Sequence, residues 1–185
     1  FSHREPERNN FTDNGTYPAP EAERLTDYEL GYTYTGDSWR VGANFYYMEY
    51  KDQFVQTGEF SDIGENLTTN IKDSYRAGIE LQAGIDPTSW LTIEGNAALS
   101  KNVIRDFDEK VQVDWGDFTT IHYDNSTLAF SPSTLLNGFV NFHYKGFQAT
   151  WHTNFVSRQY LDNTECKDRS LPSYSLSNVS MSYSY

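Results

Sequence analysis

The sequence predicts an all-β protein, an antiparallel meander that crosses a membrane as part of a β-barrel. Two observations lead to this prediction. Long stretches alternate between apolar and polar residues, as strands with two different faces do. The connections between them alternate between tight turns and long polar loops. Short turns at one end and long loops at the other are typical of membrane-spanning antiparallel barrels.

Composition supports β structure and argues against one class of partner. Aromatic residues make up 16% and hydrophobic residues 37% of the 185 residues. This combination suits a pleated surface and the aromatic girdles at membrane interfaces. The formal net charge of −12 argues against a nucleic-acid partner, because phosphate binding needs a basic surface. No run of about 18 apolar residues, the length of a transmembrane helix, occurs in the chain.

The first hairpin follows a polar segment. Residues 1–23 contain three prolines and no sustained period, so we expect a loop there. Alternation begins at residue 24 and runs through the hairpin 24–47, which turns at Gly36-Asp37. Because side chains two positions apart share one face of a strand, this hairpin has an apolar and a polar face. The apolar face is formed by Tyr28, Leu30, Tyr32, Tyr34, Trp39, Val41, Ala43, Phe45 and Tyr47.

The second and third hairpins repeat this pattern. Residues 75–85 alternate without a break, whereas a helical period of about 3.6 would mix their apolar and polar sets. The alternation continues over 91–100 after a tight turn. The third hairpin covers 136–155 with a two-residue turn at Lys145-Gly146, and a last strand covers 178–185. Most of these seven candidate strands have roughly the 9–11 residues that a tilted membrane strand needs.

The lengths of the connections predict which end of the wall faces the periplasm and which faces the outside of the cell. Long polar loops are expected at 57–73, 101–128 and 158–172, and they alternate with the tight turns. We therefore expect the tight turns on the periplasmic side and the long loops outside the cell. An interfacial aromatic belt is expected beside the tight turns, where the sequence places Trp39, Trp90 and Tyr144. Alternation by itself also fits a soluble β-sandwich, so the loop asymmetry carries the membrane prediction.

Several segments resemble the distal barrel of TonB-dependent outer-membrane receptors, in the order that this family shows. The segment Ser74–Glu80 matches the pattern S-x-R-x-G-x-E that is typical of the family. The resemblance rests on the order and spacing of the segments over nearly the whole chain. The other segments are Arg4-Glu5-Pro6-x-Arg8, Pro20-Glu21 leading into Arg24–Tyr32, Asn44–Gln53, Ser131-Pro132-Ser133 and Arg158–Thr164.

The resemblance implies a parent protein with a barrel of about 22 strands closed by a plug. Such receptors take energy from the inner-membrane TonB complex through a short N-terminal box, and they import ferric siderophores, haem, cobalamin or glycans. We expect residues 1–185 to be a partial barrel domain from the C-terminal half of such a receptor, without the plug. Its expected partners are the plug, the remaining barrel, outer-membrane lipid, an extracellular nutrient and, through the missing N-terminal part, the TonB complex.

Five side chains on the polar face of the predicted strands are candidates for the barrel lumen. Two roles are open for the charged ones: they could line the transport path or contact the plug, or they could form a charge ladder that stabilises neighbouring strands. The two-residue turn places His143 opposite Gln148 and His152 opposite Phe139. The two imidazole rings are then on the order of 13 Å apart, which is too far for one metal ion. The candidates are Glu29, Arg76, Glu80, His143 and His152.

Four aromatic side chains are candidates for ligand contact at the rim or on the loops. Tyrosine also prefers the membrane interface, so a girdle role is the alternative for Tyr46 and Tyr50. The candidates are Tyr46, Tyr50, Trp115 and Tyr160.

The sequence offers no catalytic or cofactor-binding pattern. It contains no nucleophile elbow, P-loop, dinucleotide fingerprint or zinc signature, so we expect neither an enzyme nor a cofactor. The acidic run within 101–128 lacks the ligand spacing of a calcium loop and reads as a solvated surface. Cys166, the one cysteine, reads as an incidental loop residue. The expected role is a wall segment in energised nutrient uptake, with a passive porin or a soluble glycan-binding module as alternatives.

Overall fold

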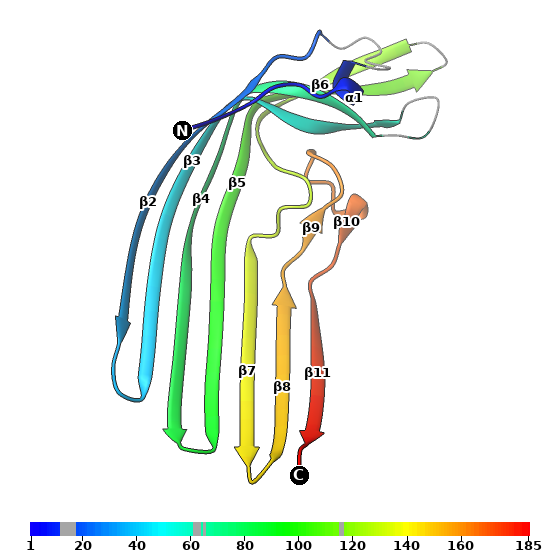
Figure 1. Ribbon diagram of the computed structural model, residues 1–185. Coiled ribbons are helices and arrows are strands. Elements are labelled where there is room, and N and C mark those ends of the chain that lie inside the picture. The colour runs from blue at the N-terminus through cyan, green and yellow to red at the C-terminus, as the bar shows by residue number, and fades with distance from the viewer. Residues whose placement is uncertain (12–17, 61–63, 65, 115–116) are drawn as a thin grey trace.

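Antiparallel strands dominate the structure, a computed structural model that describes residues 1–11, 18–60, 64, 66–114 and 117–185. Within these residues, a nine-stranded sheet has the order β1-β2-β3-β4-β5-β7-β8-β11, with β6 paired to β5 (Figure 1). Two short strands, β9 (Gln159–Tyr160) and β10 (Ser170–Leu171), form a separate ribbon. The strands of the large sheet are β1 (Ser2–Arg4), β2 (Glu23–Thr35), β3 (Trp39–Phe60), β4 (Asn66–Thr88), β5 (Leu91–Asp114), β6 (Asp117–Thr127), β7 (Thr134–Tyr144), β8 (Phe147–Val156) and β11 (Tyr174–Tyr183).

The meander predicted from alternation is confirmed. The seven expected strands correspond to β2, β3, β4, β5, β7, β8 and β11, and each pairs antiparallel with its neighbours. The tight turns lie together at the lower end of the sheet in Figure 1. The predicted register of the third hairpin is also confirmed, since His143 pairs with Gln148 and His152 with Phe139.

The opposite end of the sheet differs from the prediction. The expected loops at 57–73 and 101–128 are wrong, because β3, β4 and β5 continue far into them and β6 forms a hairpin with β5. Their apolar side chains explain the difference, since they pack into a small core instead of facing solvent. The expected loop at 1–23 contains β1 and the short helix α1 (Arg8–Phe11).

The small core lies near the upper end of the long hairpins. It consists of Val55, Ile71, Ile104, Phe107 and Leu128, with Tyr123 packed against it. Ile104 is completely buried. Two aspartates inside the long strands have left-handed backbone conformations, φ 56° at Asp52 in β3 and φ 54° at Asp106 in β5. Such conformations redirect a strand, and Asp tolerates them better than most residues.

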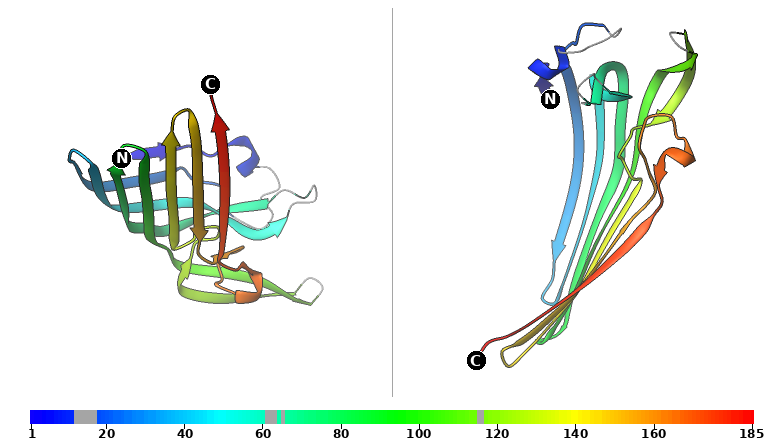
Figure 2. Two further views of the ribbon diagram at one scale, coloured as in Figure 1. Left: turned by 90° about the horizontal axis from the view of Figure 1, so that it is seen from below. Right: turned by 90° about the vertical axis from the view of Figure 1, so that its right-hand side faces the viewer.

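Below this core the sheet is a single curved layer (Figure 2). Its apolar face is open, with Leu30 73%, Tyr32 70% and Met181 70% exposed. Strands β2 and β11 lie at opposite sides of the sheet and do not pair with each other within the described residues. The sheet is therefore an unclosed segment of barrel wall, in agreement with the predicted fold class.

Candidate functional site

The polar face of the sheet carries the first candidate site. We define the polar face as the side that carries Glu29, Arg76, Glu80, His143 and His152, opposite the apolar face of Leu30 and Tyr32. Glycines on this face stand directly opposite long side chains of the neighbouring strand: Gly42 pairs with Gln82, Gly78 with Tyr46 and Gly84 with Arg40. A Cβ atom on Gly78 would lie 2.5 Å from the Tyr46 hydroxyl. The long side chains therefore lie flat along the wall, over the space that the glycines leave.

One ion pair crosses the polar face by means of this arrangement. Arg40 on β3 passes over Gly84 on β4 and pairs with Glu94 on β5. The charge ladder that the sequence suggested was assigned to Glu29, Arg76 and Glu80, which form no ion pair within the described residues. Arg40 was missed because it lies beside a tight turn. Gly84, which pairs with Arg40, was the feature of the sequence that could have indicated this crossing.

The predicted polar-face residues instead make local contacts with aromatic rings. The Arg76 guanidinium carbon lies 5.8 Å from the centre of the Tyr50 ring, which joins a lumen candidate to a rim candidate. The His152 imidazole stacks on Phe139 with the ring centres 4.2 Å apart and the planes parallel within 1°. The Nε2 atom of His152 is buried and has no hydrogen-bond partner within the described residues.

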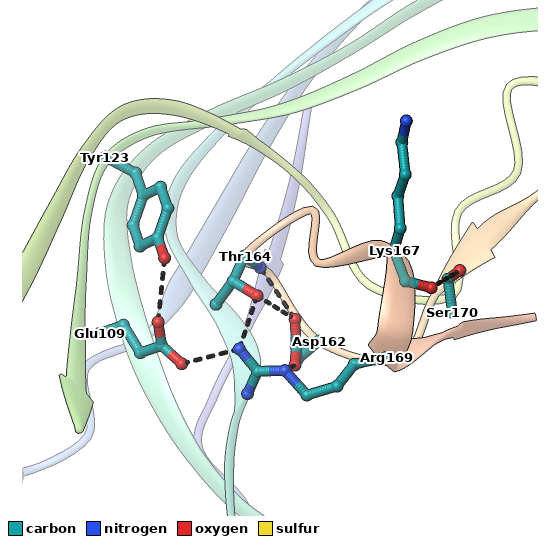
Figure 3. A network of polar contacts seen from close by, with 7 residues as sticks. All are labelled: Glu109, Tyr123, Asp162, Thr164, Lys167, Arg169 and Ser170. Atoms are coloured by element: carbon teal, nitrogen blue, oxygen red, sulfur yellow. Dashed lines mark hydrogen bonds and ion pairs between the residues drawn. The ribbon is translucent and has the colours of Figure 1, made fainter. Parts of the chain in front are cut away.

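The second candidate site lies at the upper end, where three segments meet. We call it the outer unit: the β5–β6 hairpin beyond Asp106, the connection 128–133 and the loop 157–173. Arg169 joins two of these segments (Figure 3). Its Nη2 atom lies 3.2 Å from Glu109 Oε1 on β5, and its Nε atom lies 2.9 Å from Asp162 Oδ2 in the loop. The Tyr123 hydroxyl donates to Glu109 Oε2 at 3.0 Å.

A buried asparagine fixes the third segment. Asn163 is 2% exposed. Its Oδ1 atom accepts from the Ala129 backbone N–H at 2.8 Å, and its Nδ2 atom donates to the Gln56 carbonyl oxygen at 2.9 Å. The Phe130 N–H also donates to the Tyr160 carbonyl oxygen at 2.9 Å. The loop 157–173 is thus bound to two hairpins and to the connection between β6 and β7.

Charge shapes the chemistry of the outer unit. The hydrogen bond to Asp108, 2.8 Å long, raises the pKa of His122, and the carboxylate of Asp124 adds to this effect. Hydrogen bonds from the backbone of Asp168 and Arg169 lower the pKa of the Cys166 thiol, and the Arg169 side chain contributes in the same direction. No group of His, Cys, Asp and Glu side chains within the described residues has the arrangement of a metal site.

The structure adds a cleft that the sequence did not reveal. It has a volume of about 440 Å³ and lies beside the β4–β5 pair where the strands pass Asp106. The residues that line it are contributed by distant parts of the chain, which is why no local motif marks it. They include Asn70, Lys72, Asp73, Arg105, Asp108 and His122.

The four aromatic candidates lie in different places. Tyr46 lies over Gly78 within the wall, and Tyr50 lies beside Arg76. Tyr160 is in β9, in the outer unit. Trp115 lies outside the described residues. Ligand contact by these four side chains stays a prediction.

The fold and its two faces define a segment of the wall of a membrane β-barrel. Residues 3–185 match the family model for the "TonB dependent receptor-like, beta-barrel" domain. The chain belongs to this family, whose members are transport receptors of the Gram-negative outer membrane. No curated protein sequence matches it.

Solved structures show the same fold at low sequence identity. The copper transporter OprC is 17% identical, with a TM-score of 0.69, and the match covers 98% of this chain and 28% of OprC. The ferric yersiniabactin uptake receptor FyuA from Yersinia pestis is 20% identical, with a TM-score of 0.60, and the match covers 88% of this chain and 22% of FyuA. A mutant (G324V) of the ferric enterobactin receptor PfeA from Pseudomonas aeruginosa is 13% identical, with a TM-score of 0.58 and coverages of 90% and 24%.

The chain thus spans about a quarter of the length of the solved structures that it matches. No helix within the described residues is long and apolar enough to cross a membrane.

Proposed function

We propose that this chain is a wall segment from the C-terminal half of an outer-membrane receptor that imports a scarce nutrient with energy from the TonB complex. The family match over residues 3–185 is the observation that carries the proposal. The structural relatives add support, because their names describe uptake of copper, ferric yersiniabactin and ferric enterobactin. The proposed nutrient is a scarce metal, a metal chelate such as a ferric siderophore, haem, cobalamin or a glycan.

In this proposal the two faces of the sheet lie in different environments. The apolar face contacts lipid, because tyrosine, leucine and methionine side chains are exposed along several neighbouring strands, and large exposed apolar patches mark interaction surfaces. The polar face then borders the lumen, and Glu29, Arg76, Glu80, His143 and His152 face the plug or the transport path. The tight turns lie in the periplasm and the outer unit lies outside the cell.

The outer unit receives the nutrient in this scheme. Extracellular segments that are held together by hydrogen bonds and ion pairs form a preorganised surface, which reduces the entropy lost when a ligand binds. The Arg169 network and Asn163 supply such bonds between segments far apart in the sequence. This organisation favours a binding receptor over a porin whose loops only narrow a channel.

Energy dependence separates the receptor from a passive porin. Cells that carry the full-length gene and cells that lack it are compared for accumulation of radioactive copper and of iron bound to siderophores. We expect at least one of these solutes to accumulate through the full-length protein, and this accumulation to stop when the proton-motive force is dissipated. Uptake that continues at the same rate without the proton-motive force would support the porin.

A further inference from the structure

Charged side chains on the apolar face are confined to its upper end. On the described strands β2 to β5, this face carries no Asp, Glu, Lys or Arg between the tight turns and the row of Tyr47. On β3 this uncharged part covers residues 39–47, roughly the nine residues that a tilted strand needs to cross a bilayer. From the row of Tyr47 up to Asp52 and Asp106, the charged residues of the apolar face are Arg24, Glu49, Lys51, Asp73, Lys101 and Arg105.

Ion pairs already engage part of this charged band. The Nη2 atom of Arg24 lies 3.0 Å from Asp52 Oδ2, and Lys51 pairs with Asp73 on the neighbouring strand. Arg105 is the register partner of Asp73 on its other side, yet Asp73 is engaged by Lys51. Asp52 and Asp73 therefore each have a partner other than Arg105.

The unpaired charge of this region is positive. Lys101 and Arg105 are exposed, as is Lys72 in the cleft beside them, and none of the three forms an ion pair within the described residues. We call Lys72, Lys101 and Arg105 the cationic patch. The nearby carboxylates without an ion pair there are Glu49 and Asp106, so unpaired cations outnumber unpaired carboxylates. This local excess occurs in a chain whose formal net charge is −12.

Aromatic rings hold the guanidinium of the cationic patch. The rings of Tyr47 and Tyr75 stack with their centres 5.8 Å apart, and the Arg105 guanidinium carbon lies 4.9 Å from the centre of the Tyr75 ring. Stacking on a ring orients the guanidinium plane and leaves its N–H donors in a fork that matches a phosphate. Arg105 is thus prepared for an anion that the described residues do not supply.

The cleft of about 440 Å³ lies directly beyond this guanidinium, since Asp73 and Arg105 both line it. Its lining also includes the amide of Asn70, the hydroxyl of Thr69 and the ammonium of Lys72. A phosphate alone is much smaller than this space. Such a lining suits a polar, hydroxyl-rich headgroup that continues from a phosphate.

The order of groups along the wall matches the order of groups along a lipid. An uncharged apolar surface comes first, then tyrosine rings, then the cationic patch and finally a polar cleft. A membrane glycolipid presents acyl chains, then phosphate groups, then sugar. Basic side chains at the edge of a bilayer attract anionic headgroups in this manner.

We propose that the cationic patch is a binding site for a phosphorylated glycolipid of the outer leaflet, with a phosphate on Arg105 and the sugar headgroup in the cleft. Lys101 and Lys72 add charge below and above the guanidinium. The site holds one lipid in a fixed position on the wall, unlike the general contact of the apolar face with acyl chains. This inference rests on the proposed function, since it requires the apolar face to meet lipid at the extracellular end.

Glycolipid binding to the purified full-length receptor tests this inference. The probe is a synthetic acylated glucosamine disaccharide that carries two phosphates, and the comparison compound is the same molecule without phosphates. Native mass spectrometry in detergent counts the glycolipid molecules on each receptor during a titration. Heat-modifiable gel mobility verifies that each variant is folded.

The variants remove cations from the patch or from a matched position. We expect Arg105→Gln to weaken binding of the phosphorylated probe about fivefold, and the further change Lys101→Gln to weaken it by a similar factor. Arg105→Lys should recover part of the affinity, because an ammonium keeps the charge and loses the fork. The control is Lys145→Gln at a tight turn, where Lys145 lies 5.3 Å from the centre of the Tyr144 ring. We expect the control to bind the probe as the unmodified receptor does.

The other outcomes separate the inference from the proposed function. Equal binding of the two compounds, or an equal loss in Lys145→Gln and Arg105→Gln, would overturn the inference and leave the receptor proposal intact. Displacement of the probe by an equal concentration of inorganic phosphate would also overturn it, because the site would then bind a free anion and not a lipid. A full-length protein that stays monodisperse without detergent and binds neither compound would contradict both.

Discussion

Individual glycines control how far side chains extend from this wall. Arg40, Tyr46 and Gln82 each lie across a glycine on the adjoining strand, so the polar face stays flat although its side chains are long. A flat inner wall can accommodate a folded domain at close range. These glycines therefore indicate, as much as the long side chains themselves do, where a side chain crosses to the adjoining strand.

Gly78→Ala tests this packing. The added methyl group would lie 2.5 Å from the Leu99 carbonyl oxygen, a backbone atom that cannot move aside alone. We expect a loss of about 1–3 kcal/mol in the free energy of unfolding of the full-length protein. The matched control is Gly138→Ala, whose methyl group would make an ordinary contact of 3.5 Å with Thr153. Equal stability of the two variants in urea unfolding would contradict the account.

His122 gives a prediction for pH. Because the hydrogen bond to Asp108 raises its pKa above the ordinary value of 6.5, the folded hairpin binds the proton more tightly than the unfolded chain. Its stabilising contribution is complete below pH 6.5 and is lost as the pH rises through the raised pKa. Exchange of the imidazole carbon-bound hydrogen, followed by mass spectrometry, measures this pKa. We expect Asp108→Asn to lower it, and an unchanged titration would exclude Asp108 as the cause.

At the scale of elements, the long hairpins and the loop 157–173 behave as one body. Arg169 supplies one link, since its guanidinium reaches Glu109, Asp162 and Thr164 together. Glu109 and Asp162 have side chains only 13% and 12% exposed, so the Arg169 guanidinium offsets the water that these carboxylates lose on folding. The outer unit is thus a folded assembly in its own right.

Arg169→Gln should loosen the outer unit. We expect faster backbone hydrogen exchange in the hairpin 107–123 and in the loop 157–173, while the lower strands stay unchanged. Arg169→Lys should recover only part of the protection, because an ammonium group cannot reach the same set of acceptors as a guanidinium fork. Full protection in Arg169→Gln would show that the network contributes nothing to the assembly.

Asn163→Ala should have a larger effect on the same loop. The substitution leaves the Ala129 N–H and the Gln56 carbonyl without their partner, at a cost of about 1–3 kcal/mol for each buried group. We expect increased exchange at residues 128–131 as well as in the loop. Lys167→Ala is the control, because the Lys167 side chain points away from the network (Figure 3) and its carbonyl keeps the bond from Ser170. A comparable effect of both substitutions would contradict the role of Asn163.

Alternation predicted the lower wall well and the outer unit poorly. Below Asp52 and Asp106 every strand has one apolar and one polar face, so a period of two residues is sufficient to place each side chain. Close to these aspartates the alternation fails, because the adjacent residues Val103 and Ile104 are both buried and Phe107 is buried beside charged neighbours. The contacts of Asn163 and Arg169 join segments that are distant in the sequence, with no local pattern to mark them.

At the scale of the whole molecule, the sheet is incomplete without neighbours. The apolar face is open, and within the described residues β11 and the part of β2 beyond its short pairing with β1 have free edges. Unpaired edges and exposed apolar surface promote association between chains. We therefore expect residues 1–185, produced alone without detergent, to aggregate. A monodisperse preparation in aqueous buffer would contradict the assignment of the apolar face to lipid.

The intact mass of the native gene product in separated outer-membrane and soluble fractions tests the central claim most directly. The account predicts a product several times heavier than the 21.3 kDa of this chain, recovered with the outer membrane, because a receptor contains a complete barrel and a plug. A product near 21.3 kDa in the soluble fraction would contradict it and would favour a soluble glycan-binding module.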